Sequence, residues 1–139
     1  MKFVTADTAT EETVDSALDE AFKAVVSEEV QGAIFGKKYV RIVIDAVCDA
    51  RRVARADVLG RLRNRNIVWP RQEAQYILHK TTSKSFPQIA KEFDRDHTSV
   101  IHSVRSVERR MHDAEYRAEV SGIMAEAWKR YEKNNPQPR

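Results

Sequence analysis

A short polar segment, Asp96–Ser99, lies between two segments of helical apolar periodicity in this 139-residue chain. His97 has ring nitrogens that can donate or accept a hydrogen bond at a base edge, and the Thr98 methyl group can pack on a thymine methyl. Val100 and Ile101 follow directly, and we expect these apolar residues to turn inward behind the polar tip. This division suits a helix that presents its N-terminal residues to the major groove of DNA.

The elements on either side of this segment predict how the tip is held. Ser85 and Gln88 have the spacing of a capping box, which predicts a helix over about 86–93. Asp96 can cap a second helix over about 97–111, after a turn of about three residues. Two short helices at this spacing are typical of a helix-turn-helix, and an ordinary helical hairpin with a polar tip is the alternative.

The distribution of charge indicates an anionic partner. Residues 1–36 contain two basic and eight acidic residues, a net charge of −6, whereas residues 37–139 contain 22 basic and 13 acidic residues, a net charge of +9. The stretch 51–80 holds eight arginines and lysines against two acids, and its segment Arg63–Asn66 forms a basic loop that cannot bury itself. A solvated face usually mixes signs, so this block favours a nucleic acid as partner.

Composition and periodicity predict an all-α fold, because helix formers dominate and the chain has only four Gly and four Pro. We expect a compact domain of about six to seven helices over residues 37–133, with the helix-turn-helix inside it. An added acidic amphipathic helix, about 11–34 within residues 1–36, precedes it, and a disordered tail over 134–139 follows. The other expected helices run from Lys38 to Arg52, from Ala56 to Arg61, from Pro70 as first helical residue, and over about 113–132.

Three blocks, Trp69–Ala74, Ser85–Ala90 and Arg95–His102, resemble the C-terminal DNA-binding domain of the bacterial replication initiator DnaA. The resemblance covers about residues 40–132 and does not include the ATPase portion of that family. It implies a six-helix domain that binds the DnaA box, a short asymmetric duplex site. In the turn before the second helix the family usually has two glycines, where this chain has the single residue Asp94.

The resemblance also implies roles for individual residues. Arg63 would enter the minor groove, where a narrow A·T-rich groove attracts arginine, and a solvated loop arginine is the alternative. Asp96, His97 and Thr98 would contact base edges in the major groove, although helix capping alone would also explain Asp96. Phosphates would be held by Arg71, Gln72, Ser99 and His102, with the backbone amides near Phe86 and Pro87. The alternatives are an exposed, idle amide for Gln72 and mere surface placement for His102. Arg65 and Arg95 complete the predicted DNA-binding residues.

Other classes of function are disfavoured by spacing. The four histidines and Cys48 do not have the spacing of a zinc site. No nucleophile lies at a spacing from Asp96 and His97 that is recognisable as a catalytic arrangement. The segment Gly32–Lys38 is one residue short of a phosphate loop and follows no strand. We therefore predict no enzyme activity, metal, cofactor or small-molecule substrate. Without a signal peptide or an apolar run of membrane-spanning length, we expect a cytoplasmic protein, either nucleoid-associated in a bacterium or phage-encoded.

The predicted function is sequence-specific binding of double-stranded DNA at DnaA-box-like sites, as a replication or transcription regulator. Lacking the ATPase portion, the chain would occupy, mark or compete for sites rather than melt DNA itself. The alternative is a protein-interaction or adaptor module, in which residues 11–34 pair with a second copy or another protein and DNA binding is weak or secondary. A steep fall of affinity with salt would distinguish DNA binding from this alternative.

Overall fold

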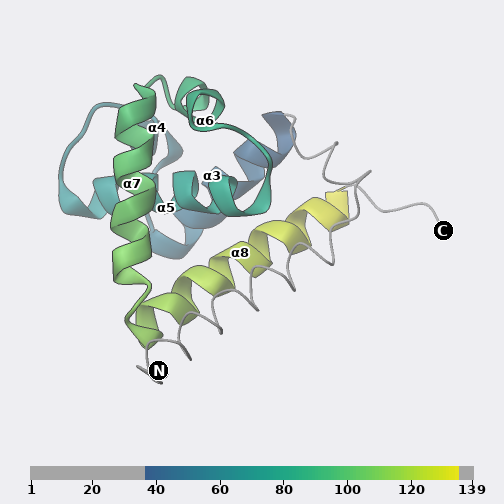
Figure 1. Ribbon diagram of the computed structural model, residues 1–139. Helices are drawn as coiled ribbons and strands as arrows, with labels where there is room; N and C mark the ends of the chain where they lie inside the picture. The colour runs from purple at the N-terminus through teal and green to yellow at the C-terminus, as the bar shows by residue number, and fades with distance from the viewer. Residues whose placement is uncertain (1–36, 135–139) are drawn as a thin grey trace, which may run out of the picture.

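The computed structural model describes residues 37–134, which form a purely helical arrangement (Figure 1). The predicted all-α class is confirmed for this range, which contains no strand. The predicted helix over 11–34 lies outside the described residues. Of the predicted tail over 134–139, Asn134 is the last residue of a helix and 135–139 lie outside the described residues. The helices in chain order are α3 (Lys37–Arg51), α4 (Arg55–Val58), α5 (Arg65–Thr81), α6 (Phe86–Glu92), α7 (His97–Arg110) and α8 (Ala114–Asn134).

Helix α5 forms the centre of the domain. Its residues from Pro70 to Leu78 are all buried, and it packs against α3, α4, α6 and α7. Figure 1 shows α7 crossing α5, with α6 beside the N-terminal end of α7 and α8 starting near its other end. Helix α8 returns to pack on α3. The core combines branched side chains such as Val43 and Ile77 with aromatic rings such as Tyr39 and Phe93, and their burial holds the helices at fixed positions around the helix-turn-helix.

The start of each helix of the helix-turn-helix is set by a local cap, as the sequence predicts. The Ser85 hydroxyl accepts the Gln88 N–H at 3.2 Å, and the Gln88 side-chain oxygen accepts the Ser85 N–H at 2.7 Å, which is a complete capping box. An Asp96 carboxylate oxygen accepts the Thr98 N–H at 3.1 Å. Both helices therefore begin at the predicted residues.

The start of α5 differs from the prediction. The helix begins at Arg65, so Pro70 lies inside it and is not the first helical residue. The Asn64 carbonyl accepts the N–H groups of both Ile67 and Val68, and burial of Ile67 favours the extra turn. Proline removes one backbone hydrogen bond, to the carbonyl of the exposed residue Asn66, where water can replace it.

The short helix before α5 also ends earlier than predicted. Helix α4 spans Arg55–Val58, whereas the sequence pattern predicts a helix over 56–61. The Leu59 N–H bonds back to the Arg55 carbonyl and the Gly60 N–H to that of Asp57, which completes one turn and no more. Residues 59–64 therefore form a loop that includes Arg61 as well as Arg63. The predicted loop over Arg63–Asn66 is wrong in its bounds, because Arg65 and Asn66 lie in α5. From here on, the basic loop means residues 59–64.

Candidate nucleic-acid interface

The polar tip of α7 faces solvent. All residues of Asp96–Ser99 are exposed, while Val100 directly behind them is fully buried and Ile101 is half-buried. Asp96 uses one carboxylate oxygen to cap the helix at the Thr98 N–H, and its other oxygen lies 3.7 Å from Nδ1 of His97. The hydroxyl and methyl of Thr98 and the ring of His97 are thus available to a partner on a helix end that the cap holds in place.

The basic loop is held from beneath by one arginine. Arg71 of α5 is only 6% exposed, and its guanidinium points under the loop. Its Nε donates to the Val58 carbonyl at 2.7 Å, and one terminal nitrogen reaches the carbonyls of Asp57, Gly60 and Leu62 at 3.2, 3.2 and 3.0 Å. Arg71 therefore gathers the backbone of the loop that carries Arg61 and Arg63.

The basic loop and the turn of the helix-turn-helix meet in space, although they are more than 30 residues apart in the chain. Arg95 donates from its guanidinium to the Gly60 carbonyl. Arg61 pairs with Asp94, with 3.0 Å between the guanidinium nitrogen and the carboxylate oxygen. Because Arg95 and Asp94 directly precede the polar tip, these contacts bring the tip and the loop to the same part of the surface.

Arginines crowd this junction and raise its positive potential. We call Arg61, Arg63, Arg71 and Arg95 the loop cluster. Burial lowers the pKa of Arg71, and the charges of Arg95 and Arg61 lower it further. Burial likewise lowers the pKa of Arg95, with added repulsion from Arg61 and Arg63, against which Asp94 acts in the opposite direction. Mutual repulsion among cations held this close is the condition under which an anion such as a phosphate binds well.

The remaining predicted site residues are divided between the surface and the interior. Ser99 and His102 are exposed on α7, and Pro87 is exposed at the start of α6. Phe86 is half-buried and stacks on His79, with 4.8 Å between ring centroids. Pro87 has no N–H, and the Gln88 N–H is engaged by Ser85, so Phe86 supplies the remaining first-turn amide. Gln72 is buried, and its side-chain oxygen accepts a hydrogen bond from the guanidinium of Arg110 at 3.0 Å.

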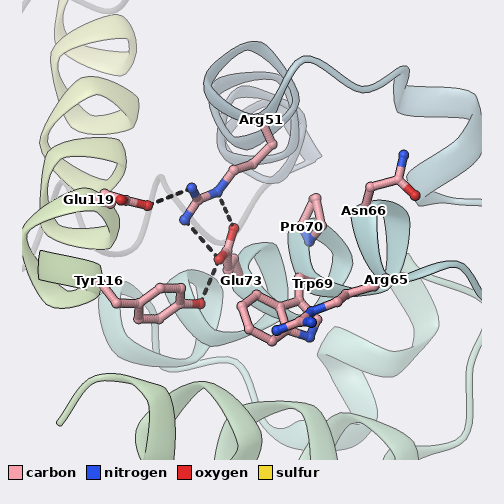
Figure 2. Close-up of a pocket in the computed structure, with 8 residues that line it drawn as sticks. All are labelled: Arg51, Arg65, Asn66, Trp69, Pro70, Glu73, Tyr116 and Glu119. Atoms are coloured by element: carbon pink, nitrogen blue, oxygen red, sulfur yellow. Dashed lines mark hydrogen bonds and ion pairs between the residues drawn. The ribbon is translucent and has the colours of Figure 1, made fainter. Parts of the chain in front are cut away.

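A second group of charges lies between α3, α5 and α8, beside an open pocket of about 540 Å³ (Figure 2). At its centre is Glu73, which is fully buried. Its two carboxylate oxygens each accept from Arg51 at 2.9 Å, and one also accepts the Tyr116 hydroxyl at 2.5 Å. Arg51 further pairs with Glu119 at 2.7 Å. We call Arg51, Glu73, Tyr116 and Glu119 the Glu73 cluster.

The titration behaviour of the Glu73 cluster reflects this pairing. Burial alone would lower the pKa of Arg51, but the hydrogen bonds and charges of Glu73 and Glu119 outweigh it and raise that pKa. Burial raises the pKa of the Tyr116 hydroxyl, and the neighbouring Glu73 charge raises it further. At neutral pH Arg51 therefore stays protonated and Tyr116 keeps its hydroxyl proton, and their contacts with Glu73 join the end of α3 and the start of α8 to the middle of α5.

Trp69, beside the Glu73 cluster, holds two further arginines. Figure 2 shows the Arg65 side chain lying against Trp69. Its guanidinium is 4.2 Å from the Trp69 ring centroid, and the guanidinium of Arg110 is 3.9 Å from the same centroid. Arg65 is exposed at the first residue of α5, directly after the basic loop. Stacking on the ring limits the orientations that its long side chain can take.

One residue of this surface was missed by sequence reasoning. Arg61 is exposed in the basic loop, yet the sequence pattern assigns it to the end of a short helix. Its position two residues before Arg63, within the same block of basic residues, is the signal that identifies it. Among residues 37–134 there is no group of three or more His, Cys, Asp and Glu side chains placed to hold a metal ion. In that same range no helix is long and apolar enough to cross a membrane.

The packing of α6 against α7, with polar residues at the exposed start of α7, makes this a helix-turn-helix domain. Comparison with known proteins identifies the kind. Residues 40–107 match the family model described as the bacterial dnaA protein helix-turn-helix. This part of the chain belongs to the bacterial DnaA helix-turn-helix family, which is a non-catalytic DNA-binding domain of replication initiators.

Relatives of the chain include chromosomal replication initiator proteins DnaA from several bacteria. That of Sphingopyxis alaskensis is 43% identical over 89 residues, which are 60% of this chain and 20% of the relative. That of Caldanaerobacter subterraneus is 32% identical over 108 residues, 77% of this chain and 23% of the relative. That of Neisseria meningitidis FAM18 is 46% identical over 67 residues, 48% of this chain and 13% of the relative. The chain thus spans about a quarter or less of the length of these relatives.

Proposed function

We propose that this domain binds double-stranded DNA at DnaA-box-like sites, with the tip of α7 in the major groove and the basic loop in the adjacent minor groove. The observation that carries the proposal is the exposed tip Asp96–Ser99 beside the loop cluster. The Arg61–Asp94 and Arg95–Gly60 contacts hold the loop next to that tip. A duplex that meets the tip therefore also meets the arginines.

The tip residues would contact base edges. Thr98 offers a methyl group to a thymine and a hydroxyl to a neighbouring acceptor, and His97 offers a ring nitrogen. Asp96 caps the helix with one carboxylate oxygen, and its other oxygen, 3.7 Å from Nδ1 of His97, would face the same base edges. Ser99 and His102 are exposed on α7, where they would contact phosphates and fix the depth of this helix in the groove.

The basic loop would supply the second half of the recognition. Arg63 is exposed on the loop and would enter the minor groove, where the negative potential is deepest at A·T-rich sequence. Arg71 would act from below, because its guanidinium already donates to four carbonyls and is almost buried. Gln72 would act in the same indirect way through Arg110. Arg65, which directly follows the loop, and Arg95, which contacts Gly60 near its start, would add phosphate contacts.

The biological role that we propose is regulation of replication or transcription by occupancy of such sites. Its support is the family membership of residues 40–107. Because the matched region is a small part of each DnaA relative, the activities of the whole initiator are not carried over to this chain. Occupying a site would be enough to mark it or to exclude another DNA-binding protein from it.

Selection of bound duplexes from a random pool tests this proposal. The full chain should recover a short asymmetric motif similar to a DnaA box, with affinity that falls steeply as salt rises. Recovery of no motif, or of a motif unrelated to the DnaA box, would contradict the proposed site.

Two substitutions at Thr98 assign the major-groove end. Thr98→Ser keeps the hydroxyl but removes the methyl, so it should lose preference for one thymine, about 1 kcal/mol of discrimination for one buried methyl group. Thr98→Val keeps the methyl and should retain that thymine. An equal loss on all sequences for both variants would mean that Thr98 contacts the backbone and not a base.

A further inference from the structure

Asp94 is an acidic residue in the middle of an arginine-rich surface. It lies in the turn between α6 and α7 with a φ of 51°, a left-handed conformation that aspartate adopts more readily than most residues. Its side chain is 91% exposed, so burial does not explain its presence.

The carboxylate of Asp94 has a defined partner. One of its oxygens lies 3.0 Å from a guanidinium nitrogen of Arg61, which is in the basic loop, 33 residues away in the chain. Both side chains are largely exposed, and an ion pair of this kind contributes little to folding stability. Its effect is electrostatic, because Asp94 opposes the influence of Arg61 and Arg63 on the neighbouring Arg95.

Carboxylate and phosphate oxygens bind guanidinium in the same way, by charge-assisted hydrogen bonds. We propose that Asp94 occupies Arg61 as an internal substitute for a DNA phosphate and so limits the affinity of the interface for every duplex. The inference rests on the proposed DNA-binding function. When DNA binds, either the Arg61–Asp94 pair separates or a carboxylate stays close to the phosphates, and both oppose binding.

The predicted effect is the same for all sequences. Phosphates carry no direct sequence information, so a residue that competes with them changes overall affinity and leaves base preference unaltered. Arg61 would neutralise a phosphate only after Asp94 is displaced. Removing the Asp94 charge should therefore release about one more counterion on binding. The plot of log affinity against log salt concentration should then be steeper by roughly 0.9.

The experiment compares the full chain with Asp94→Asn, which keeps the side-chain shape and tolerates the left-handed backbone. Binding is measured by fluorescence anisotropy at several salt concentrations, with a DnaA-box duplex and with a scrambled duplex. We expect Asp94→Asn to bind both duplexes roughly fivefold more tightly at low salt, with a salt slope steeper by about one.

Two controls show that the gain arises at Arg61. Asp49→Asn removes another exposed carboxylate, which pairs with Arg130 at 2.9 Å between α3 and α8, and it should leave DNA affinity unchanged. In an Arg61→Gln background, Asp94→Asn should lose most of its gain, because the cation that it releases is absent.

The outcomes separate the inference from the function on which it rests. If the parent chain binds DNA and Asp94→Asn binds no more tightly, the inference is wrong and the proposed function stands. If the gain persists in full without Arg61, Asp94 repels DNA without occupying Arg61, and the inference is again wrong. If neither the parent nor Asp94→Asn binds any duplex, the proposed function fails and the inference fails with it.

Discussion

The loop cluster and the Glu73 cluster contain the same kind of side chain in opposite circumstances. In the Glu73 cluster, Arg51 is matched by one buried carboxylate and one half-exposed carboxylate. In the loop cluster, the exposed carboxylate of Asp94 pairs with Arg61, whereas Arg71 and Arg95 donate to backbone carbonyls. An arginine whose counter-charge is supplied by its own chain holds helices together, whereas an arginine without one is available to an anionic partner.

The largest effect that this comparison predicts is on stability, at Glu73. Glu73→Gln removes the buried negative charge. Glu119 is then the one carboxylate that still pairs with Arg51 in the cluster, and the hydrogen bond from Tyr116 is weaker. We expect a loss of about 3 kcal/mol in the free energy of unfolding, the lower end of the range for a broken buried pair because Arg51 keeps partial contact with solvent. Unfolding in urea, followed by circular dichroism, measures it.

A matched control is Glu126→Gln, which removes a half-exposed carboxylate that pairs with Arg130 one turn away on α8. That variant should change stability by less than about 0.5 kcal/mol. A loss below about 1 kcal/mol for Glu73→Gln would place the Glu73 cluster among ordinary surface ion pairs and remove the contrast with the loop cluster.

The second largest effect is on binding, at Arg63. Arg63→Ala should weaken binding to a DnaA-box duplex by about 2 kcal/mol and flatten the preference for A·T pairs at the minor-groove end of the site. Its stability should not change, because the side chain is exposed. Binding to duplexes substituted one pair at a time measures the effect, and an unaltered A·T preference would exclude Arg63 from the minor groove.

Arg71 sharpens this test because it is placed to act through the loop. Arg71→Lys keeps the charge but loses the planar fork that reaches four carbonyls, so it should weaken specific binding by roughly tenfold. In the Arg63→Ala background the same change should add little, since the loop then has no minor-groove residue to position. Losses that add in full would mean that Arg71 contacts DNA independently, as the family resemblance implies.

The sequence predicted what depends on local contacts. The capping box at Ser85 and Gln88 and the cap at Asp96 involve residues two or three positions apart, so their spacing was sufficient. The start of α5 was predicted wrongly. Proline favours the first position of a helix, but here the burial of Ile67 offsets the hydrogen bond that Pro70 loses inside the helix.

Contacts between distant parts of the chain could not be predicted. The burial of Arg71 depends on carbonyls that α4 and the basic loop bring together, and no pattern in the sequence shows that they converge. The pairing of Arg61 with Asp94 spans 33 residues and is equally hidden. The sequence therefore identified the surface that carries the basic residues, whereas only the fold distinguishes the arginines that support it from those that face a partner.

The smallest predicted effect concerns Arg65, which lies between the two clusters. It follows the basic loop, yet its guanidinium stacks on Trp69 beside the Glu73 cluster. Arg65→Ala should cost less than about 1 kcal/mol of stability, the range of an exposed cation–π contact. If Arg65 also binds a phosphate, Arg65→Ala should weaken binding to cognate and scrambled duplexes alike. It should also reduce the slope of log affinity against log salt by about one.

Trp69→Phe separates these two roles, because it weakens the stacking while leaving the Arg65 charge in place. It should lower stability slightly and change DNA affinity by less than about twofold. If Arg65→Ala left DNA affinity unchanged, its guanidinium would serve only to cover Trp69, and the boundary of the DNA-binding surface would run between Arg63 and Arg65. If both variants weakened binding equally, Trp69 would be what orients Arg65 toward the phosphate, and stacking on an aromatic ring would be a third way, besides carboxylates and carbonyls, in which this domain fixes an arginine.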